Sequence, residues 1–373
     1  MKVFVLGTRG FPGVQGGVEK HCEELYPRLV RQAAEITVFT RTPYIPRRER
    51  RKRWEGIRFI HLWSPKTKSL EAITHTLIGV VIARYCSPDI LHVHAVGPSI
   101  CIPLAKVLGL KVVMTHHGPD YEREKWGRAA KAVLKLGEYL GTRFADRIIA
   151  ISRGIAGSLE KRVRANERVF YIPNGVRIPE VLPAGETLRR LRLEPRGYVF
   201  TACRFVPEKG LHDLIRAYQK IKNPEFKLVI AGDADHENDY SRMIKQLARE
   251  SSGVVLSGAI SGMPLRELFS QAGLFVLASY YEGLPIALLE ALSYGLPVLA
   301  SDIPQNREIP LPEFRYFEPG NSEVLASKMV KLFEAGIDQA EEVRQKDYLT
   351  ANHNWDILAR ETYQVYRSMV DQD

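Results

Sequence analysis

Short apolar runs alternate with longer amphipathic stretches along the first half of the chain. The apolar runs lie at residues 2–6, 36–39, 57–60, 90–93, 111–115 and 147–151. Most of them are separated by stretches with helical periodicity, which begin at Val18 and recur at 70–85, 97–108 and 124–144. Strands that alternate with helices in this way predict a parallel sheet covered on both faces.

The same alternation restarts after residue 196. Strands are predicted at 198–203, 226–231, 254–257, 274–277 and 297–300, and helices at 211–220, 238–250, 264–271, 286–294 and 322–333. A proline-rich stretch, 173–196, separates the two halves and predicts a linker. We therefore expect two α/β domains at 1–172 and 197–354, followed by a last amphipathic helix within 355–373.

Length and composition agree with this division. A chain of 373 residues suggests about two domains. With 45% hydrophobic and 26% charged residues it is neither a disordered chain nor a collagen or a disulfide miniprotein. No run reaches the roughly 20 apolar residues that cross a bilayer, and the apolar N-terminal run is too short for a signal peptide. These features predict a cytoplasmic protein.

The charge balance favours anionic partners. The chain carries 53 Lys and Arg against 43 Asp and Glu, a net charge of +10, which attracts phosphates, acidic lipids or nucleic acid. The basic cluster 47–53 fits an anionic lipid, an anionic acceptor or a solvated loop. Few aromatic residues interleave with it, so we expect no nucleic-acid partner. The stretch 121–147 is basic and amphipathic, and it either rests on a membrane surface or packs on its own domain.

Two carboxylates flank the start of a predicted helix, at Glu282 and Glu290. Pro285 is suited to a helix start, and Glu290 is surrounded in sequence by leucine and alanine. A carboxylate among apolar residues is costly unless polar groups satisfy it. The two carboxylates could bind the hydroxyls of a sugar and a ribose. Alternatively, Glu282 is an acid at the start of the helix and Glu290 makes a structural hydrogen bond.

Arg204 and Lys209 follow the first predicted strand of the second half. They precede a helix whose N-terminus favours anions, and Arg and Lys are the side chains that bind phosphate. The alternative is a pair of solvated surface cations.

A glycine-rich loop, 7–17, follows the first predicted strand of the chain. Glycines let the backbone approach a ligand closely, but the loop lacks the G-x-G-x-x-G spacing of dinucleotide-binding proteins.

Histidines end two later strands, as His92-x-His94 and His116-His117. No acid stands among them at a diagnostic spacing, so we predict no metal site.

Together these motifs resemble the retaining glycosyltransferases of family 4, which have the GT-B fold of two Rossmann-like domains facing across a cleft. The resemblance covers nearly the whole chain. It rests on Gly16-Gly17-Val-Glu19, Thr115-His-His117-Gly118, Ile151-Ser152, Pro173-Asn-Gly-Val176, Arg204 with Lys209, Ala231-Gly232-Asp233, the spacing from Glu282 to Glu290, and Ala300-Ser-Asp302. Gly7-Thr-Arg-Gly10 and Arg123-Glu-Lys-Trp126 resemble a bacterial rhamnosyltransferase-like branch.

The resemblance implies a role for each matching position. Arg204 and Lys209 would hold the donor diphosphate, Glu290 the ribose, and Glu282 with the amides of Gly283 and Leu284 the transferred sugar. Gly16, Gly17 and Gly232 would line the donor. His117 would lie near the anomeric carbon, with His116, Arg9 and Tyr121 as candidates on the acceptor side. The last helix would cross back to the first domain.

The resemblance also implies the reaction. We expect a metal-independent, cofactor-free transfer from a nucleoside-diphosphate sugar, with UDP as the expected nucleotide. The acceptor would be a glycan or a lipid-linked glycan of cell-surface polysaccharide synthesis, met in the cytoplasm or at the inner face of the membrane. Two alternatives remain open, namely a nucleotide-sugar epimerase of the same two-domain plan and a non-catalytic protein that binds anionic polymers.

Overall fold

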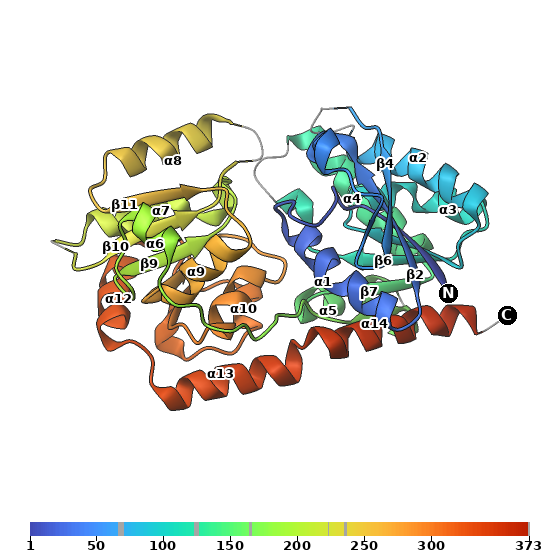
Figure 1. The fold of residues 1–373 in the computed structure, drawn as a ribbon. Coiled ribbons are helices and arrows are strands. Elements are labelled where there is room, and N and C mark those ends of the chain that lie inside the picture. The colour runs from blue at the N-terminus through green and yellow to red at the C-terminus, as the bar shows by residue number, and fades with distance from the viewer. Residues whose placement is uncertain (66–70, 123–126, 164–165, 223, 235–236, 372–373) are drawn as a thin grey trace. The chain divides into compact units, whose positions relative to one another are not determined.

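The computed structural model describes residues 1–373 except 66–70, 123–126, 164–165, 223, 235–236 and 372–373. The chain divides into two compact units (Figure 1). Unit 1 comprises 1–174 together with 355–373, and unit 2 comprises 175–354. The Arg123–Trp126 motif lies outside the described residues.

Unit 1 is built on an eight-stranded sheet of order β3-β4-β2-β1-β5-β6-β7-β8. The strands are β1 Lys2–Leu6, β2 Glu35–Arg41, β3 Arg53–Trp54, β4 Ile57–Leu62, β5 Ile90–His94, β6 Val112–His116, β7 Arg147–Ala150 and β8 Val169–Tyr171. All neighbours pair in parallel except β3 with β4. The helices are α1 Gly17–Arg31, α2 Glu71–Cys86, α3 Ile102–Val107, α4 Arg128–Phe144, α5 Arg153–Val163 and α14 Trp355–Val370.

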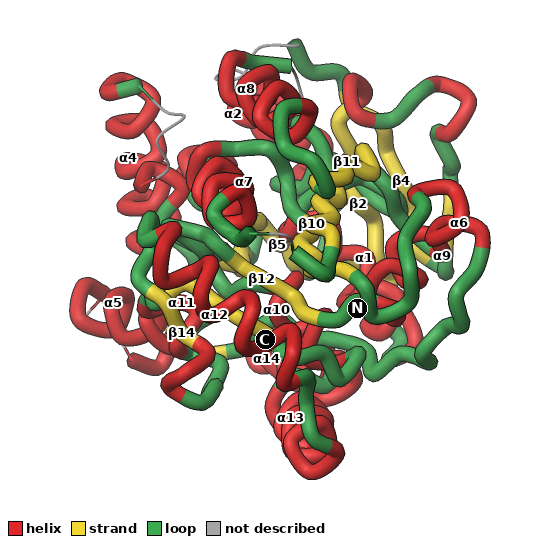
Figure 2. Tube along the Cα trace, turned by 90° about the vertical axis from the view of Figure 1, so that its left-hand side faces the viewer, coloured by secondary structure: helices red, strands yellow, loops and turns green. Residues whose placement is uncertain are grey.

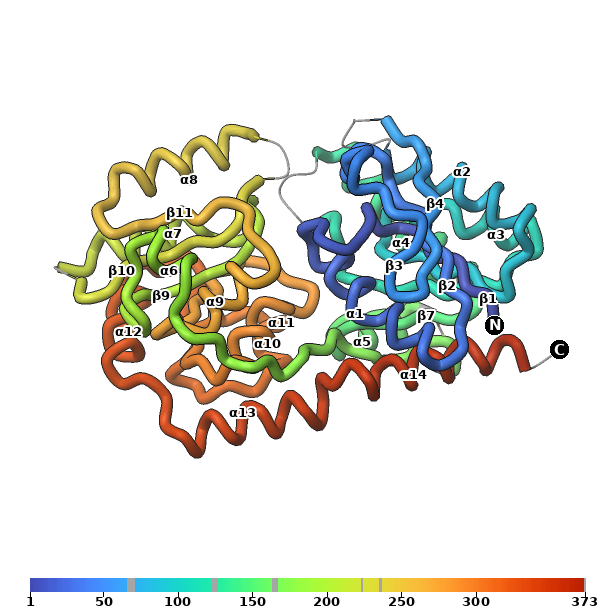
Figure 3. Tube along the Cα trace, in the orientation of Figure 1, coloured from blue at the N-terminus to red at the C-terminus, as the bar shows by residue number. Residues whose placement is uncertain are grey.

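Helices cover both faces of this sheet because strand side chains alternate between the faces. Val3 and Val5 of β1 pack in one core with α1 and α14. Phe4 and Leu6 pack in the other core, with α2, α3, α4 and α5. The last helix, α14, joins unit 1 because its apolar residues recur every three or four positions along the face that meets α1 (Figure 3).

Unit 2 is built on a six-stranded parallel sheet of order β11-β10-β9-β12-β13-β14. The strands are β9 Tyr198–Ala202, β10 Lys227–Ala231, β11 Val254–Gly258, β12 Leu274–Leu277, β13 Val298–Ser301 and β14 Tyr316–Phe317. The helices are α6 Glu186–Leu191, α7 Leu211–Gln219, α8 Asp239–Arg249, α9 Met263–Gln271, α10 Ile286–Ser293, α11 Pro304–Arg307, α12 Ser322–Ala335 and α13 Gln339–Asn352. Figure 2 shows α7, α10 and α12 around the strands of this sheet.

The proline-rich stretch predicted as a linker, 173–196, does more than join the halves. It contains α6, and the backbone N–H groups of Gly185 and Leu188 donate to Glu267 Oε1 of α9 at 2.8 and 3.0 Å. A carboxylate at a helix N-terminus satisfies amides that have no partner within the helix. Most of the stretch therefore belongs to unit 2.

Both sheets have a point where the strand order reverses. In unit 1 the chain passes from β1 to β2 on one side and later returns to β5 on the other; in unit 2 the corresponding neighbours are β9 and β12. Ligands of open α/β sheets bind beyond the carboxyl ends of the strands at such a switch point. Functional groups are therefore expected in the loops after these four strands.

Candidate active site

In unit 2, the loops after β9 and β12 bring Lys209 and Glu282 together. Lys209 Nζ lies 2.5 Å from Glu282 Oε1, and Ser279 Oγ donates to the same oxygen at 2.6 Å. The Lys209 side chain is 20% exposed and that of Glu282 only 9%. The predicted cation and the predicted carboxylate thus form one partly buried, hydrogen-bonded ion pair at the switch point.

Gly210 makes this approach possible. It has a positive φ of 60°, and a Cβ atom there would lie 2.1 Å from the carbonyl oxygen of Ala278. No other residue fits such contact without moving the backbone. Tyr280 N–H also donates to the carbonyl of Glu208 at 2.9 Å, which ties the two loops together.

Arg204 belongs to the same charged neighbourhood. Burial raises the pKa of the Cys203 thiol to about 12, the charges of Lys209 and Arg204 act to lower it, and those of Glu282 and Glu208 act to raise it. The thiol therefore lies among two cations and two carboxylates. Arg204 itself is half-buried.

Glu290 is placed on α10, whose start at Ile286 follows Glu282, Gly283, Leu284 and Pro285. The leucines and alanine beside it are buried, whereas Glu290 is half-buried. Gly232 follows β10 with a φ of 128°, at the same end of the sheet.

In unit 1, the glycine-rich loop follows β1 at the switch point. Gly7 has a φ of 100°, and a Cβ atom there would lie 2.1 Å from the carbonyl oxygen of His94, at the end of β5. Gly16 precedes α1, and Gly17 is the first residue of α1, where an added Cβ would meet no atom within 4 Å. The Arg9 N–H donates to Glu19 Oε1 at 3.0 Å, and the Arg9 guanidinium lies 4.8 Å from the ring centre of Tyr44.

Three histidines gather beside this loop. His117 Nε2 lies 2.9 Å from His94 Nδ1, and the ring of His21, from α1, meets that of His117 edge to face at 4.9 Å between centres. One nitrogen from each ring lies within 4.8 Å of the others, a spacing that a metal ion could use. Because His94 and His117 are already hydrogen-bonded to each other, we assign the rings to a hydrogen-bonded cluster.

Burial keeps the inner histidines neutral. It lowers the pKa of His21 to about 4, although the hydrogen bond with Asn174 acts in the opposite direction. It also holds the pKa of His94 well below its ordinary value, with the neighbouring histidines adding to the effect. His117 is half-buried. It is the histidine of this cluster nearest to solvent.

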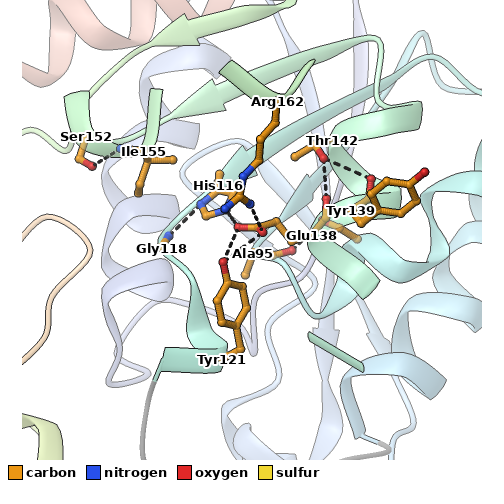
Figure 4. Close-up of polar contacts among 11 residues, drawn as sticks. Ala95, His116, Gly118, Tyr121, Glu138, Tyr139, Thr142, Ser152, Ile155 and Arg162 are labelled. Atoms are coloured by element: carbon orange, nitrogen blue, oxygen red, sulfur yellow. Dashed lines mark hydrogen bonds and ion pairs between the residues drawn. The ribbon is translucent and has the colours of Figure 1, made fainter. Parts of the chain in front are cut away.

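His116 and Tyr121, the candidates for the acceptor side, both contact Glu138. His116 is 1% exposed; its Nε2 lies 2.8 Å from Glu138 Oε1, and its Nδ1 accepts from the N–H of Gly118 at 3.1 Å (Figure 4). Tyr121 OH donates to Glu138 Oε2 at 3.1 Å, and Arg162 Nη1 lies 2.8 Å from the same oxygen. These side chains therefore form a brace between β6, α4 and α5.

Glu138 is the centre of that brace. Burial alone would raise the pKa of Glu138, but His116, Arg162 and Tyr121 together hold that pKa below its ordinary value. Glu138 could not be picked out from the sequence, because one acid in an amphipathic helix carries no local signal. Nor could His21, whose hydrogen-bond partner Asn174 lies far away in the sequence, or Ser279, a single serine in a loop.

The two basic surfaces differ. In the cluster 47–53 most side chains are exposed, but Arg50 turns back to the carbonyls of Thr42 and Ile45. On α4, Leu134 packs in the core while Val133, Leu136 and Tyr139 are exposed. The helix thus packs on its own unit and still presents apolar side chains to solvent. The described residues contain no helix that could span a membrane.

Both halves of the chain match known protein families. The family described as Glycosyltransferase Family 4 matches residues 15–178, and that described as Glycosyl transferases group 1 matches residues 188–349. The structure superposes on a sucrose-phosphate synthase from Thermosynechococcus elongatus with a TM-score of 0.81 at 20% identity, covering 100% of both chains. It superposes on HepE of Anabaena, solved with UDP-glucose, with a TM-score of 0.79 at 18% identity, covering 99% and 100%. The fold and the motifs define a GT-B glycosyltransferase, and hence an enzyme.

Sequence relatives narrow the class. An uncharacterized glycosyltransferase of Methanocaldococcus jannaschii is 26% identical over 98% of both chains. A UDP-Gal:α-D-GlcNAc-diphosphoundecaprenol α-1,3-galactosyltransferase of Escherichia coli is 30% identical over 61% of this chain and 62% of its own. A GDP-mannose:cellobiosyl-diphosphopolyprenol α-mannosyltransferase of Xanthomonas oryzae is 30% identical over 62% and 60%. This chain belongs to glycosyltransferase family 4.

Proposed function

We propose that this glycosyltransferase moves a sugar from a nucleoside-diphosphate sugar to a lipid-linked glycan, with retention of the anomeric configuration and without a metal ion. The single observation that carries the proposal is the Lys209–Glu282 pair at the switch point of unit 2. Two curated relatives are named for transfer to diphosphate-linked polyprenol acceptors, which supports the choice of acceptor.

The donor binds through unit 2 in this proposal. Lys209 and Arg204 face the diphosphate, because a cation there offsets the negative charge that grows on the leaving phosphate. Glu282, with the amides of Gly283 and Leu284, binds the transferred sugar, and Glu290 binds the ribose. The relatives named for UDP-Gal and for GDP-mannose differ in the base; UDP is our proposal for this chain.

The reaction breaks the bond between the anomeric carbon and the phosphate oxygen. The acceptor hydroxyl forms the new bond on the same face of the sugar, and its proton passes to the departing phosphate. The transition state has oxocarbenium character. Lys209 and Arg204 replace a divalent cation because their charges are already in place before the bond breaks. His117 contacts the sugar or the acceptor.

Unit 1 serves the acceptor in this proposal, at the inner face of a membrane. On α2, the exposed side chains Leu77, Val81 and Tyr85 recur every four residues and hence lie on one face of the helix. Together with the exposed apolar side chains of α4 and the basic cluster 47–53, they suit an anionic lipid surface.

A transfer assay with purified lipid-linked glycan tests the proposal. UDP-, GDP-, dTDP- and ADP-sugars are first compared for the thermal shift that their nucleotides produce, and the best donors are then incubated with the acceptor. We expect a glycosylated lipid whose new linkage has the donor's anomeric configuration by NMR. Conversion of the donor alone to its epimer, or an inverted linkage, would contradict the proposal.

A further inference from the structure

The loop after β6 carries His117 beyond the paired part of the unit 1 sheet. Thr115 is the last residue of β6 that pairs with β5, and His116 is the last that pairs with β7. Residues 117–119, which we call the β6 loop, then lead to a short 3₁₀ turn at Asp120–Glu122. The pairing of the sheet therefore fixes His116 but does not extend to the loop that carries His117.

The side chain of His116 reaches back to the β6 loop. Its Nδ1 accepts from the N–H of Gly118 at 3.1 Å, and its Nε2 lies 2.8 Å from Glu138 Oε1 (Figure 4). The donor is known in each contact, because a backbone N–H can only donate and a carboxylate can only accept. His116 Nδ1 therefore carries no hydrogen, and Nε2 donates its hydrogen to Glu138. A hydrogen on Nδ1 would set a second donor against the Gly118 N–H and break that contact.

Glu138 is held by three donors. Besides the His116 contact at Oε1, its Oε2 accepts from Tyr121 O–H at 3.1 Å and from Arg162 Nη1 at 2.8 Å. Burial acts to raise the pKa of Glu138, but the hydrogen bonds from His116 and Tyr121 and the charge of Arg162 together bring that pKa below its ordinary value. Glu138 is therefore a carboxylate near neutral pH and accepts the His116 hydrogen.

Close packing of α4 sets the position of Glu138. A Cβ atom on Gly137 would lie 2.3 Å from the carbonyl oxygen of Val96, and one on Gly141 would lie 2.6 Å from Ser99 Cβ. The two glycines are four residues apart and hence lie on one face of α4, which they allow to approach the segment after β5. The backbone beside Glu138 is thus packed against the rest of unit 1, so Glu138 can hold His116 in a defined place.

We propose that Glu138 is a positioning residue that acts through His116: it holds the Gly118 amide, and with it the β6 loop that carries His117. The hold on the loop concerns the protein alone. Its value for catalysis rests on the proposed function, in which His117 contacts the sugar or the acceptor. Without Glu138, the buried Nε2–H of His116 loses its acceptor, which is unfavourable. The ring then turns toward another partner and releases Gly118.

NMR of the full chain can observe Gly118 by itself. His117–Gly118 is the one place in the sequence where a glycine follows a histidine. Labelling histidine with ¹³C at the carbonyl and glycine with ¹⁵N therefore leaves a single signal, that of the Gly118 amide, in a spectrum that selects bonded ¹³C–¹⁵N pairs. The hydrogen-exchange rate of this signal measures how firmly the amide is bonded. We expect slow exchange, and exchange at the rate of an unprotected amide would overturn the inference.

Two substitutions at Glu138 separate its hydrogen bond from its charge. Glu138→Ala removes the acceptor, and we expect exchange of the Gly118 amide to rise about tenfold, the equivalent of one hydrogen bond. Glu138→Gln keeps an oxygen that accepts from His116, while Arg162, whose side chain is 59% exposed, can turn to solvent. It should keep most of the protection. If exchange in Glu138→Ala equals that of the unchanged chain, Glu138 has no hold on the loop.

Glu24→Ala is the matched control. Glu24 is another buried helical carboxylate of unit 1, 4% exposed, and its Oε2 lies 2.9 Å from Arg28 Nη1. The substitution removes an ion pair of α1 and leaves the printed contacts of His116 in place, so exchange of the Gly118 amide should not change. A rise as large as that in Glu138→Ala would mean that a general loss of stability opens the loop, and would refute the inference.

Substitutions at His116 test whether Glu138 acts through this ring. His116→Asn keeps an acceptor for the N–H two residues on, as in an Asx-turn, but removes the link to Glu138. Gly118 should stay protected, and adding Glu138→Ala to His116→Asn should cause no further rise in exchange. His116→Leu removes both contacts and should speed exchange about as much as Glu138→Ala does. A Gly118 amide that stays protected in His116→Leu would overturn the inference. If Glu138→Ala does not fold, Glu138→Leu fills the space without an acceptor and takes its place.

Activity separates this inference from the proposed function. If both hold, Glu138→Ala lowers kcat about tenfold with little change in donor KM, because the donor diphosphate binds in unit 2. Glu138→Gln keeps most of the activity, and Glu24→Ala leaves kcat unchanged. A faster-exchanging Gly118 with unchanged kcat would contradict the positioning role. The expected exchange pattern in a chain that transfers no sugar would sink only the proposed function. Transfer by a chain whose Gly118 ignores Glu138 would sink only the inference.

Discussion

The two units place functional groups at the same point of similar sheets but use opposite chemistry. At the switch point of unit 2, cations and carboxylates meet in a partly exposed cluster around Cys203. At that of unit 1, neutral imidazoles and phenols form a buried network. A shared topology therefore fixes where a ligand binds, whereas the side chains after the strands decide what is bound.

The difference has a physical basis in burial. Lys209 retains partial contact with water, and Glu282 gains both a cation and the Ser279 hydroxyl, so the cost of removing these charges from water is offset. His92 and His94 of unit 1 have no such contact with water, and burial holds the pKa of each well below its ordinary value, so both remain neutral. Under the proposed function, the charged groups of unit 2 bind the leaving diphosphate, and His117 of unit 1 contacts the sugar or the acceptor.

Replacing Lys209 by alanine should have the largest effect. We expect transfer to fall at least about tenfold, because one charge facing the leaving phosphate is lost. Steady-state kinetics measure the loss, and circular dichroism shows whether the chain stays folded. Because the substitution also leaves Glu282 without its cation, Lys209→Ala combined with Glu282→Gln should recover stability but not activity. Unchanged turnover in Lys209→Ala would remove Lys209 from the mechanism.

Acid should weaken unit 1 before unit 2. In the unfolded chain, His21 and His92 have the ordinary histidine pKa of 6.5 and bind protons below that pH. In the folded chain, burial lowers their pKa values to about 4 and about 3, so they stay neutral until the pH is much lower. Because the unfolded state binds more protons, stability falls as the pH falls between these limits. From about pH 7 to about pH 5, the free energy of unfolding should drop on the order of 2 kcal/mol for each of these histidines.

Tryptophan fluorescence can follow this loss in unit 1 alone. The four tryptophans, Trp54, Trp63, Trp126 and Trp355, all belong to unit 1. The free energy of unfolding obtained from urea transitions followed by fluorescence reports on unit 1. It should depend more strongly on pH than the free energy of opening obtained from hydrogen exchange of the unit 2 strands. His92→Gln should reduce this pH dependence, whereas His61→Gln, at a half-buried position on β4, should not. An equal loss of stability in the two units would contradict the expectation that acid destabilises unit 1 first.

Glu290→Ala should have a smaller and more selective effect. If Glu290 binds the ribose hydroxyls, the donor KM rises several-fold, consistent with the loss of charge-assisted hydrogen bonds worth about 1.5 kcal/mol or more, and kcat changes less. Glu290→Gln should retain part of the affinity because its amide still offers a hydrogen-bonding oxygen. If only the melting temperature falls, Glu290 is structural.

The sequence predicted the fold and the class of protein well, because both are carried by local patterns. Apolar runs marked most strands of the two sheets, and the periodicity of 355–369 anticipated α14. The short strand β14 and the helix α13 were missed, since two residues give no alternation and α13 has only one fully buried residue, Leu349. The linker was misjudged because Glu267, which caps α6, lies 80 residues away.

The sequence could point to candidate site residues only where they belong to a motif or follow a predicted strand. Arg204 and Lys209 were predicted from their place after a strand, and Glu282 and Glu290 from their spacing; the structure brings Lys209 to Glu282. Spacing says nothing of partners that packing supplies, so it could not show that His116 meets Glu138 or that His117 meets His94. The sequence favoured His117 over His116 by its match to the motif, but it could not show the separate partners that packing gives to the two rings.

Removing metal ions should have the smallest effect. In the proposed reaction, Lys209 and Arg204 already supply the positive charge that a divalent ion would otherwise bring to the diphosphate, so full activity is expected in excess chelator. Transfer rates with EDTA, alone and followed by added magnesium, measure this. A loss that magnesium restores would show that the cations of unit 2 are insufficient. A loss that zinc restores would instead point to His21, His94 and His117, whose nitrogens lie within 4.8 Å of one another, and would replace the neutral network of unit 1 with a metal centre.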